Sequence, residues 1–369
     1  MDFQLDQTQL DRAMNLHRHS LVIDMHSDVH LDVIRSRGQG EVRVLERRHY
    51  PQWKKGGVDV VVLNSMAKFG PETYPYRTSP VHNFLLMADA IQQEIIESSD
   101  KFFQILEPED ISRAKAEKKI GILFGTEGAE PVEQNLGFLR CYYQLGLRIM
   151  NLTWHQRNQV ADGVAERSNS GLSNFGRDLV KEMNRLGILI DVSHLGRQGV
   201  RDVLEISEHP IIASHSNAWA LCSHERNLED WQIEGIAKKG GMIGVVFVGR
   251  FVAEENPTLT QVLDHLDYIA KLAGRDRVGM GPDYTDYCQD MIISSRRVAG
   301  PGQPVNDPDI PYARDVEDAS KLLHFTQGLV SRGYRDDEIR GILGENFVRV
   351  FKDVRERREE IRCESNIRL

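Results

Sequence analysis

Eight short apolar runs, most of them separated by segments with helical periodicity, constrain the fold of this chain most strongly. Each run is nearly continuous in apolar, often β-branched residues, which is typical of strands buried on both faces of a parallel sheet. The runs occupy residues 21–28, 58–66, 119–128, 147–155, 187–194, 210–217, 241–248 and 278–285. The intervening segments include 82–99, 173–187, 196–207 and 258–274. Such strand–helix units predict an α/β fold, a (β/α)8 barrel of the TIM type, with a doubly wound sheet as the alternative.

The chain has 369 residues, which is enough for one large barrel. We expect residues 1–369 to form a single barrel domain, with its strands between about 21 and 285. A stretch rich in proline, glycine and aspartate then predicts a long loop at 286–314. Helical periodicity returns at 315–360 and predicts extra C-terminal helices.

Charge and composition exclude several classes of protein. The net charge of −9 argues against a nucleic-acid partner. No apolar run approaches the 18 residues of a membrane span, and the polar amino terminus lacks the apolar core of a signal peptide. The four cysteines are scattered and form no CxxC pair, which excludes a disulfide scaffold and a thiolate zinc site. We therefore expect a cytoplasmic protein with no membrane partner.

Ionisable side chains stand at the ends of most of the predicted strands. The first run ends in DMHSD, where Asp24, His26 and Asp28 would share one face of an extended chain. Other runs end in Glu127, His155, His194, His215 and Asp283, whereas the run 241–248 has no polar end. In a (β/α)8 barrel all these ends meet on the face that carries the active site. A single histidine there is more often structural, but so many at one rim predict a metal site.

The types of side chain indicate which metals the site would bind. Imidazole and carboxylate without thiolate suit zinc in a catalytic site, and manganese or cobalt also fit. Three histidines and two carboxylates are too many for one tetrahedral ion with an open position. Because a carboxylate can bridge, we expect two ions that share Glu127, one bound by His26 and Asp28 and the other by His194 and His215. Paired ions about 3.5–4 Å apart hold a bridging hydroxide and polarise a carbonyl.

The motifs around these residues resemble the membrane dipeptidase (renal dipeptidase) family, peptidase family M19 of the amidohydrolase-like superfamily. The resemblance runs from about residue 20 to residue 352, with the motifs in the family's order. They are HxD at His26–Asp28, GTEG around Glu127, DVSH ending at His194, SHSN at His215, HERNL around Arg226, GMGPDY around Asp283, and GENFVRVF at 344–351.

The resemblance implies a dipeptidase with two zinc ions per chain, in which a bridging hydroxide attacks the peptide bond of a dipeptide. It implies that Asp283 transfers protons and that His155 stabilises the oxyanion. It also implies that Arg226 binds the substrate carboxylate, with Asn227 beside it. Because LTWHQRN carries one residue more than expected before its histidine, Trp154 is the alternative to His155 at the oxyanion position. A homodimer would be ordinary for this family.

Two other functions fit part of the pattern. A binuclear metal amidohydrolase that acts on a non-dipeptide amide or a lactone would use the same metals but would not need Arg226. A barrel that binds metal or ligand without turnover would not need Asp283 for proton transfer. A Schiff-base aldolase is disfavoured, because none of the eight predicted strands ends in lysine.

Overall fold

The structure, a computed structural model, describes residues 4–66, 79–287 and 312–365, with side chains up to residue 358. Its centre is a parallel sheet in which the strands follow the order β1-β2-β4-β5-β6-β7-β8-β9. These strands are β1 (Ile23–Ser27), β2 (Val60–Ser65), β4 (Ile120–Glu127), β5 (Leu147–Asn151), β6 (Leu189–Asp191), β7 (Ile211–Ala213), β8 (Met242–Val245) and β9 (Val278–Met280). All eight predicted strands are therefore present, in chain order.

Main-chain hydrogen bonds just beyond the two outer strands close the sheet into a barrel. The N–H of Asp28 donates to the carbonyl oxygen of Tyr284 at 3.0 Å, and the N–H of Asp283 donates to that of His26 at 3.1 Å. Closure and sequential strand order confirm the predicted (β/α)8 barrel and exclude the doubly wound sheet, in which the strand order reverses. One further strand, β3 (Phe102–Gln104), was not predicted and pairs with the first residues of β4.

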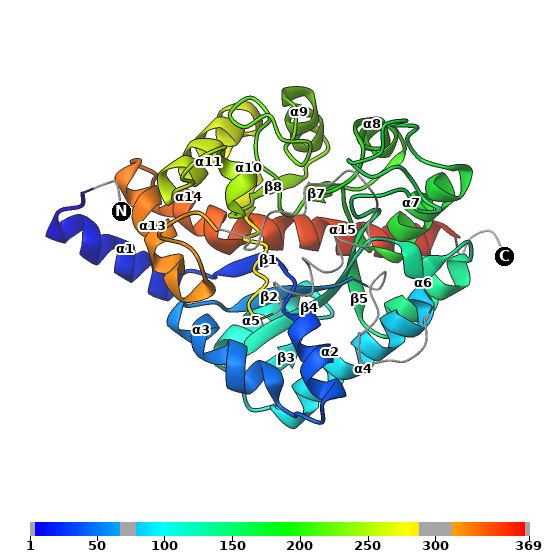
Figure 1. The fold of residues 1–369 in the computed structure, drawn as a ribbon, viewed down its shortest axis with the longest axis horizontal. Coiled ribbons are helices and arrows are strands. Elements are labelled where there is room, and N and C mark those ends of the chain that lie inside the picture. Colours follow the sequence, from blue (N-terminus) through cyan, green and yellow to red (C-terminus); the bar gives the residue numbers. More distant parts are fainter. Residues whose placement is uncertain (1–3, 67–78, 288–311, 366–369) are drawn as a thin grey trace.

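Helices surround the barrel (Figure 1). They are α1 (Gln7–His19), α2 (His30–Gly38), α3 (Tyr50–Lys55), α4 (Pro80–Glu97), α5 (Pro108–Ala116), α6 (Leu136–Gln144), α7 (Asn174–Leu186), α8 (Arg197–Ile206), α9 (Asp230–Lys238), α10 (Gly249–Val252), α11 (Leu259–Ala273), α13 (Leu322–Ser331), α14 (Asp336–Arg340) and α15 (Asn346–Ser365). The four helices and the C-terminal helices expected from periodicity are all present, whereas α1 was not predicted. Of the expected loop 286–314, residues 288–311 lie outside the described part of the chain. No helix in the described ranges has both the length and the apolar character that crossing a bilayer requires.

Local sequence signals fix where a helix ends and the next strand begins, as α7 illustrates. The hydroxyl oxygen of Ser173 accepts a hydrogen bond from the N–H of Gly176 at 3.0 Å and caps the start of this helix. Gly187 ends the helix in the left-handed conformation, with a φ of 67°. Strand β6 begins two residues later, at Leu189. This short connection returns the chain directly into the barrel.

The amino-terminal end of the barrel is closed by the C-terminal helix. Apolar side chains from the strands form a buried cluster with four side chains of α15, namely Phe347, Val350, Phe351 and Val354. The strand members include Ile23, Met25, Val60, Val62, Leu123, Ile149, Leu189, Ile212 and Met242. Figure 1 shows α15, in red, running across the barrel. With this end filled, the carboxyl ends of the strands are the open mouth.

Strand β1 departs from the regular alternation that the sequence analysis assumed. Asp24 pairs with Val61 of β2, but Ser27 pairs with Leu63, so β1 contains one extra residue over this interval. Such a bulge reverses which side chains face inward. The prediction that Asp24 shares a face with His26 and Asp28 is therefore wrong. The Asp24 carboxylate instead accepts a hydrogen bond from the N–H of His26 at 3.0 Å.

Candidate metal centre and active site

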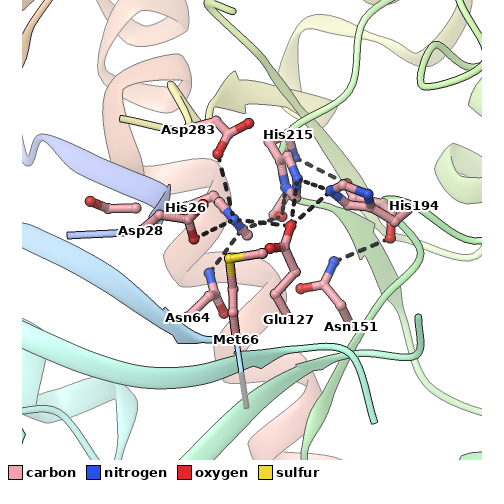
Figure 2. A network of polar contacts seen from close by, with 12 residues as sticks. His26, Asp28, Asn64, Met66, Glu127, Asn151, His194, His215 and Asp283 are labelled. Carbon is pink, nitrogen blue, oxygen red and sulfur yellow. Dashed lines mark hydrogen bonds and ion pairs between the residues drawn. The ribbon is translucent and has the colours of Figure 1, made fainter. Parts of the chain in front are cut away.

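The five predicted metal ligands converge at the mouth of the barrel (Figure 2). The Oε1 atom of Glu127, the last residue of β4, lies 2.7 Å from His194 Nε2, 3.4 Å from His215 Nε2 and 3.5 Å from His26 Nε2. Asp28 Oδ1 is 3.6 Å from His26 Nε2. Three compact donor sets occur among the described residues, namely His26–Asp28–Glu127, Glu127–His194–His215 and His26–Asp191–His215, and the first two share Glu127. The first two sets hold the residues that the sequence analysis assigned to the two ions, whereas the set with Asp191 was not predicted, and binding of metal by these residues stays a prediction.

Buried polar side chains beneath the ligands hold the histidine rings in place. The side-chain amide of Asn64 contacts His26 Nδ1 at 2.9 Å. The hydroxyl of Ser214 lies 2.7 Å from His215 Nδ1 and 3.4 Å from His26 Nδ1. Asp191 Oδ1 accepts the N–H of Ser214 at 3.0 Å. Because these side chains contact Nδ1 of both rings, Nε2 of both rings faces the centre of the site. In metal sites, a hydrogen bond to one ring nitrogen orients the histidine so that its other nitrogen can bind the metal.

The electrostatics of the donor set favour a cation. Burial, and after it the charge of neighbouring carboxylates, raises the pKa of Glu127 well above its usual range. Burial lowers the pKa of His26, and it lowers the pKa of His194 and His215 well below the usual range. The imidazoles are therefore neutral, the form that binds a metal, while an ionised carboxylate here needs a positive partner. Among the described residues, His26 Nε2 and Glu127 Oε2 have no hydrogen-bond partner. These residues fit a pair of divalent cations.

A cavity opens above the ligands. Its wall is formed by Asp28, Met66, Glu127, Trp154, His155, His194, Val248, Arg250, Phe251, Asp283 and Thr285. The His155 ring meets the His194 ring edge-on, with 4.8 Å between the ring centroids. Both candidates for the oxyanion position, His155 and Trp154, therefore lie at the site. A substrate in this cavity would contact either of them.

Asp283 lies at the edge of the ligand cluster. Its Oδ1 atom is 3.9 Å from His26 Nε2. Its φ of 65° places it in the left-handed region, and His194 is in the same region with a φ of 70°. Non-glycine residues in this region are uncommon and cluster at functional sites. Burial, followed by the charge of Asp28, raises the pKa of Asp283 to about 7. Asp283 therefore lies at the cavity wall beside His26, and its role in proton transfer stays a prediction.

Arg226 is buried beside His215 and is not among the described residues that line the cavity. It is 2% exposed, and its Nη2 donates to the carbonyl oxygen of His215 at 2.9 Å. Within the described part of the chain, its Nε and Nη1 have no hydrogen-bond partner. Burial lowers the pKa of Arg226, while the carboxylates of Asp283 and Glu127 oppose this change. A buried guanidinium with donors to spare can bind an anion.

Asn227 supports the main chain around the site. Its amide nitrogen donates to the carbonyl oxygen of Cys222 at 2.8 Å and to that of Phe251 at 2.9 Å. Both amide hydrogens are thereby used, so only Oδ1 is left for a substrate. The prediction that Asn227 binds substrate stays a prediction.

Several residues of the site were not identified from the sequence. Asn64, Asp191 and Ser214 lie below the ligands, and their signal was present, because each is a polar residue at the end of an apolar run. Arg250 gave no such signal. The run 241–248 has no polar end, and Arg250 lines the cavity five residues beyond Val245, the last residue of β8.

Comparisons with known proteins agree with the barrel fold and with the family that the motifs resemble. The sequence profile of the family described as membrane dipeptidase (peptidase family M19) matches residues 10–292 and 307–365. The crystal structure of an amidohydrolase from Pseudomonas aeruginosa is similar, with a TM-score of 0.80 and 28% identity over 93% of this chain and 99% of that chain. A probable dipeptidase, PvdM, from the same organism has a TM-score of 0.80 and 22% identity over 96% and 100% of the two chains. A metallo peptidase from Rhodobacter sphaeroides, liganded with a phosphinate mimic of the dipeptide L-Ala-D-Ala, has a TM-score of 0.77 and 23% identity over 91% and 99%.

Proposed function

Because the chain belongs to the membrane dipeptidase family, peptidase family M19, and is a metal-dependent dipeptidase, we propose that it hydrolyses dipeptides at a centre of two zinc ions. The observation that carries this proposal is the pair of buried donor sets that share Glu127. His26 and Asp28 would hold one ion, His194 and His215 the other, and Glu127 both. Such a pair supplies a water of lowered pKa as the nucleophile and polarises the scissile carbonyl.

The protein's own side chains bind the substrate and move the protons. Arg226 holds the free carboxylate of the dipeptide through its unpartnered Nε and Nη1 atoms. Asp283 accepts the proton of the attacking water at its carboxylate and transfers it to the nitrogen of the leaving amine. His155, or Trp154 in its place, donates a hydrogen bond to the oxygen of the scissile carbonyl as negative charge develops there. Two free amino acids are the products.

Metal removal tests this function. We expect two divalent ions per chain by plasma mass spectrometry, loss of dipeptide cleavage after dialysis against a chelator, and recovery on addition of zinc. The substrates are Ala–Ala and L-Ala–D-Ala, the latter because its phosphinate mimic is the ligand of the Rhodobacter sphaeroides metallo peptidase. Two bound ions without cleavage of any dipeptide would favour a non-dipeptide amide or a lactone as substrate. Absence of bound metal after reconstitution would contradict the proposed ligands.

Replacing Arg226 by methionine tests the recognition of the carboxylate. We expect the KM for Ala–Ala to rise by about tenfold to a hundredfold, because a charge-assisted hydrogen bond to a buried group is lost. Cleavage of Ala–Ala amide, which has no free carboxylate, should change little. Arg201→Met is the matched control, since Arg201 is exposed on α8. An unchanged KM in a folded variant would contradict the role of Arg226 and favour the amidohydrolase alternative.

A further inference from the structure

A second arginine belongs to the wall of the substrate cavity. Arg250 lines this cavity together with Asp28, Glu127 and Asp283. Its positive charge reaches the Asp283 carboxyl, where it opposes the rise in pKa that burial causes. The hydrolysis described above assigns the carboxylates to metal binding and proton transfer, and it assigns Arg226 to the substrate carboxylate. The charge of Arg250 has no part in that scheme.

The turn that carries Arg250 is held rigidly by two buried asparagines. Asn217 accepts the N–H of Val246 at 3.1 Å and donates to the carbonyl oxygens of Val246 and Phe251 at 3.0 and 3.2 Å. Asn227 donates to the same Phe251 oxygen at 2.9 Å. The backbone of α10 is thereby fixed on both sides of Arg250. A charge held on a fixed turn binds a ligand at a lower entropic cost than a charge on a mobile loop.

Arg250 and Arg226 pack against the same aromatic ring. The guanidinium carbon of Arg250 lies 4.7 Å from the ring centroid of Phe251, and that of Arg226 lies 5.4 Å from it. The two cations are therefore no more than about 10 Å apart. Two extended residues span about 7 Å. One dipeptide can thus place its terminal carboxylate at Arg226 and a side chain near Arg250.

We propose that Arg250 selects dipeptides that carry a second carboxylate, in an aspartate or glutamate side chain. This inference rests on the proposed dipeptidase function and adds a substrate class to it. A guanidinium at the cavity wall adds little binding free energy for a neutral side chain of the substrate. With a carboxylate, it can form two parallel hydrogen bonds. Arg250 is a specificity residue in this scheme and takes no part in bond cleavage.

The test compares pairs of dipeptides that differ in charge but hardly in shape. The values of kcat/KM are measured for Ala–Asp against Ala–Asn, and for Asp–Ala against Asn–Ala, on the zinc-loaded enzyme. In at least one pair we expect the wild type to favour the acidic member by about tenfold or more. In Arg250→Gln this ratio should fall to near one, because the acidic member of the pair loses more kcat/KM than its neutral partner. Arg250→Lys keeps the charge and should give an intermediate ratio.

A matched control is Arg201→Gln, because Arg201 also packs on an aromatic ring, with its guanidinium carbon 3.9 Å from the centroid of Trp231. This control should keep the wild-type ratios. An equal loss for acidic and neutral dipeptides in Arg250→Gln, or a wild type without acidic preference in either pair, would overturn the inference but leave the dipeptidase function intact. If the zinc-loaded wild type cleaves none of the dipeptides, the dipeptidase function fails, and the inference fails with it.

Discussion

Glu127→Gln should lose most of its bound metal, and its kcat/KM for Ala–Ala should fall by about 10³-fold or more. Glu127 is the residue shared by the sets His26–Asp28–Glu127 and Glu127–His194–His215, and its Oε1 lies within 3.5 Å of three histidine nitrogens. Glutamine keeps the shape of the side chain but removes the negative charge that would bridge two cations. We therefore expect one ion per chain or fewer by plasma mass spectrometry.

The fold of this variant gives an independent check. Burial makes the ionised form of Glu127 unfavourable and raises its pKa. Replacing it with a neutral amide should therefore not lower the melting temperature of the metal-free protein. Glu133→Gln, at an exposed position six residues further on, is the matched control and should keep both ions and full activity. Two retained ions with wild-type turnover in Glu127→Gln would exclude the bridging role.

Asp283→Asn should keep both metal ions while kcat falls by about 10²-fold or more. The carboxylate that accepts the proton is lost, whereas the proposed ligands remain in place. Asp283 has a φ of 65°, and asparagine is one of the few residues that adopt this conformation readily. The backbone of the turn should therefore survive the substitution. The matched control is Asp286→Asn, three residues later in the chain.

The pH profile separates proton transfer from a structural effect. In the wild type only the ionised form of Asp283 can accept a proton, so kcat/KM should fall as the pH drops through the pKa of this group. Bound cations oppose the upward shift in pKa that burial causes, which moves this fall to lower pH. The fall should disappear in Asp283→Asn. A variant with full turnover, or with the acid limb unchanged, would exclude Asp283 as the proton carrier.

Most of the architecture could be predicted because its signals are local. Continuous apolar runs marked the strands, and the polar residues that end them marked the mouth of the barrel. Strand β3 was missed because Gln104 interrupts the apolar residues around it, so that they form no continuous run. Asp24 was misplaced because alternation was assumed, and a bulge depends on how β1 pairs with β2. Pairing between strands cannot be read from one strand alone.

Site residues could be predicted where they end a strand. They could not be predicted where they lie several residues beyond the end of a strand. Glu127 ends β4, so topology alone brought it to the ligands. Arg250 lies beyond the end of β8, and its position depends on hydrogen bonds from Asn217 and Asn227 to the turn that carries it. The one-residue ambiguity between Trp154 and His155 had the same origin. Both side chains reach the cavity, and only the path of the loop after β5 places them there.

The two ends of the barrel are held by forces of different kinds. Contacts with α15 stabilise the amino-terminal end through apolar burial, which needs no cofactor. At the mouth, carboxylates and imidazoles lie close together instead. Burial and neighbouring carboxylates make the ionised form of Glu127 unfavourable, and bound cations would offset this cost. Without metal, local opening should therefore begin at the mouth, while the helix-covered end keeps the strands in register. We expect removal of metal to stop catalysis while the barrel stays folded.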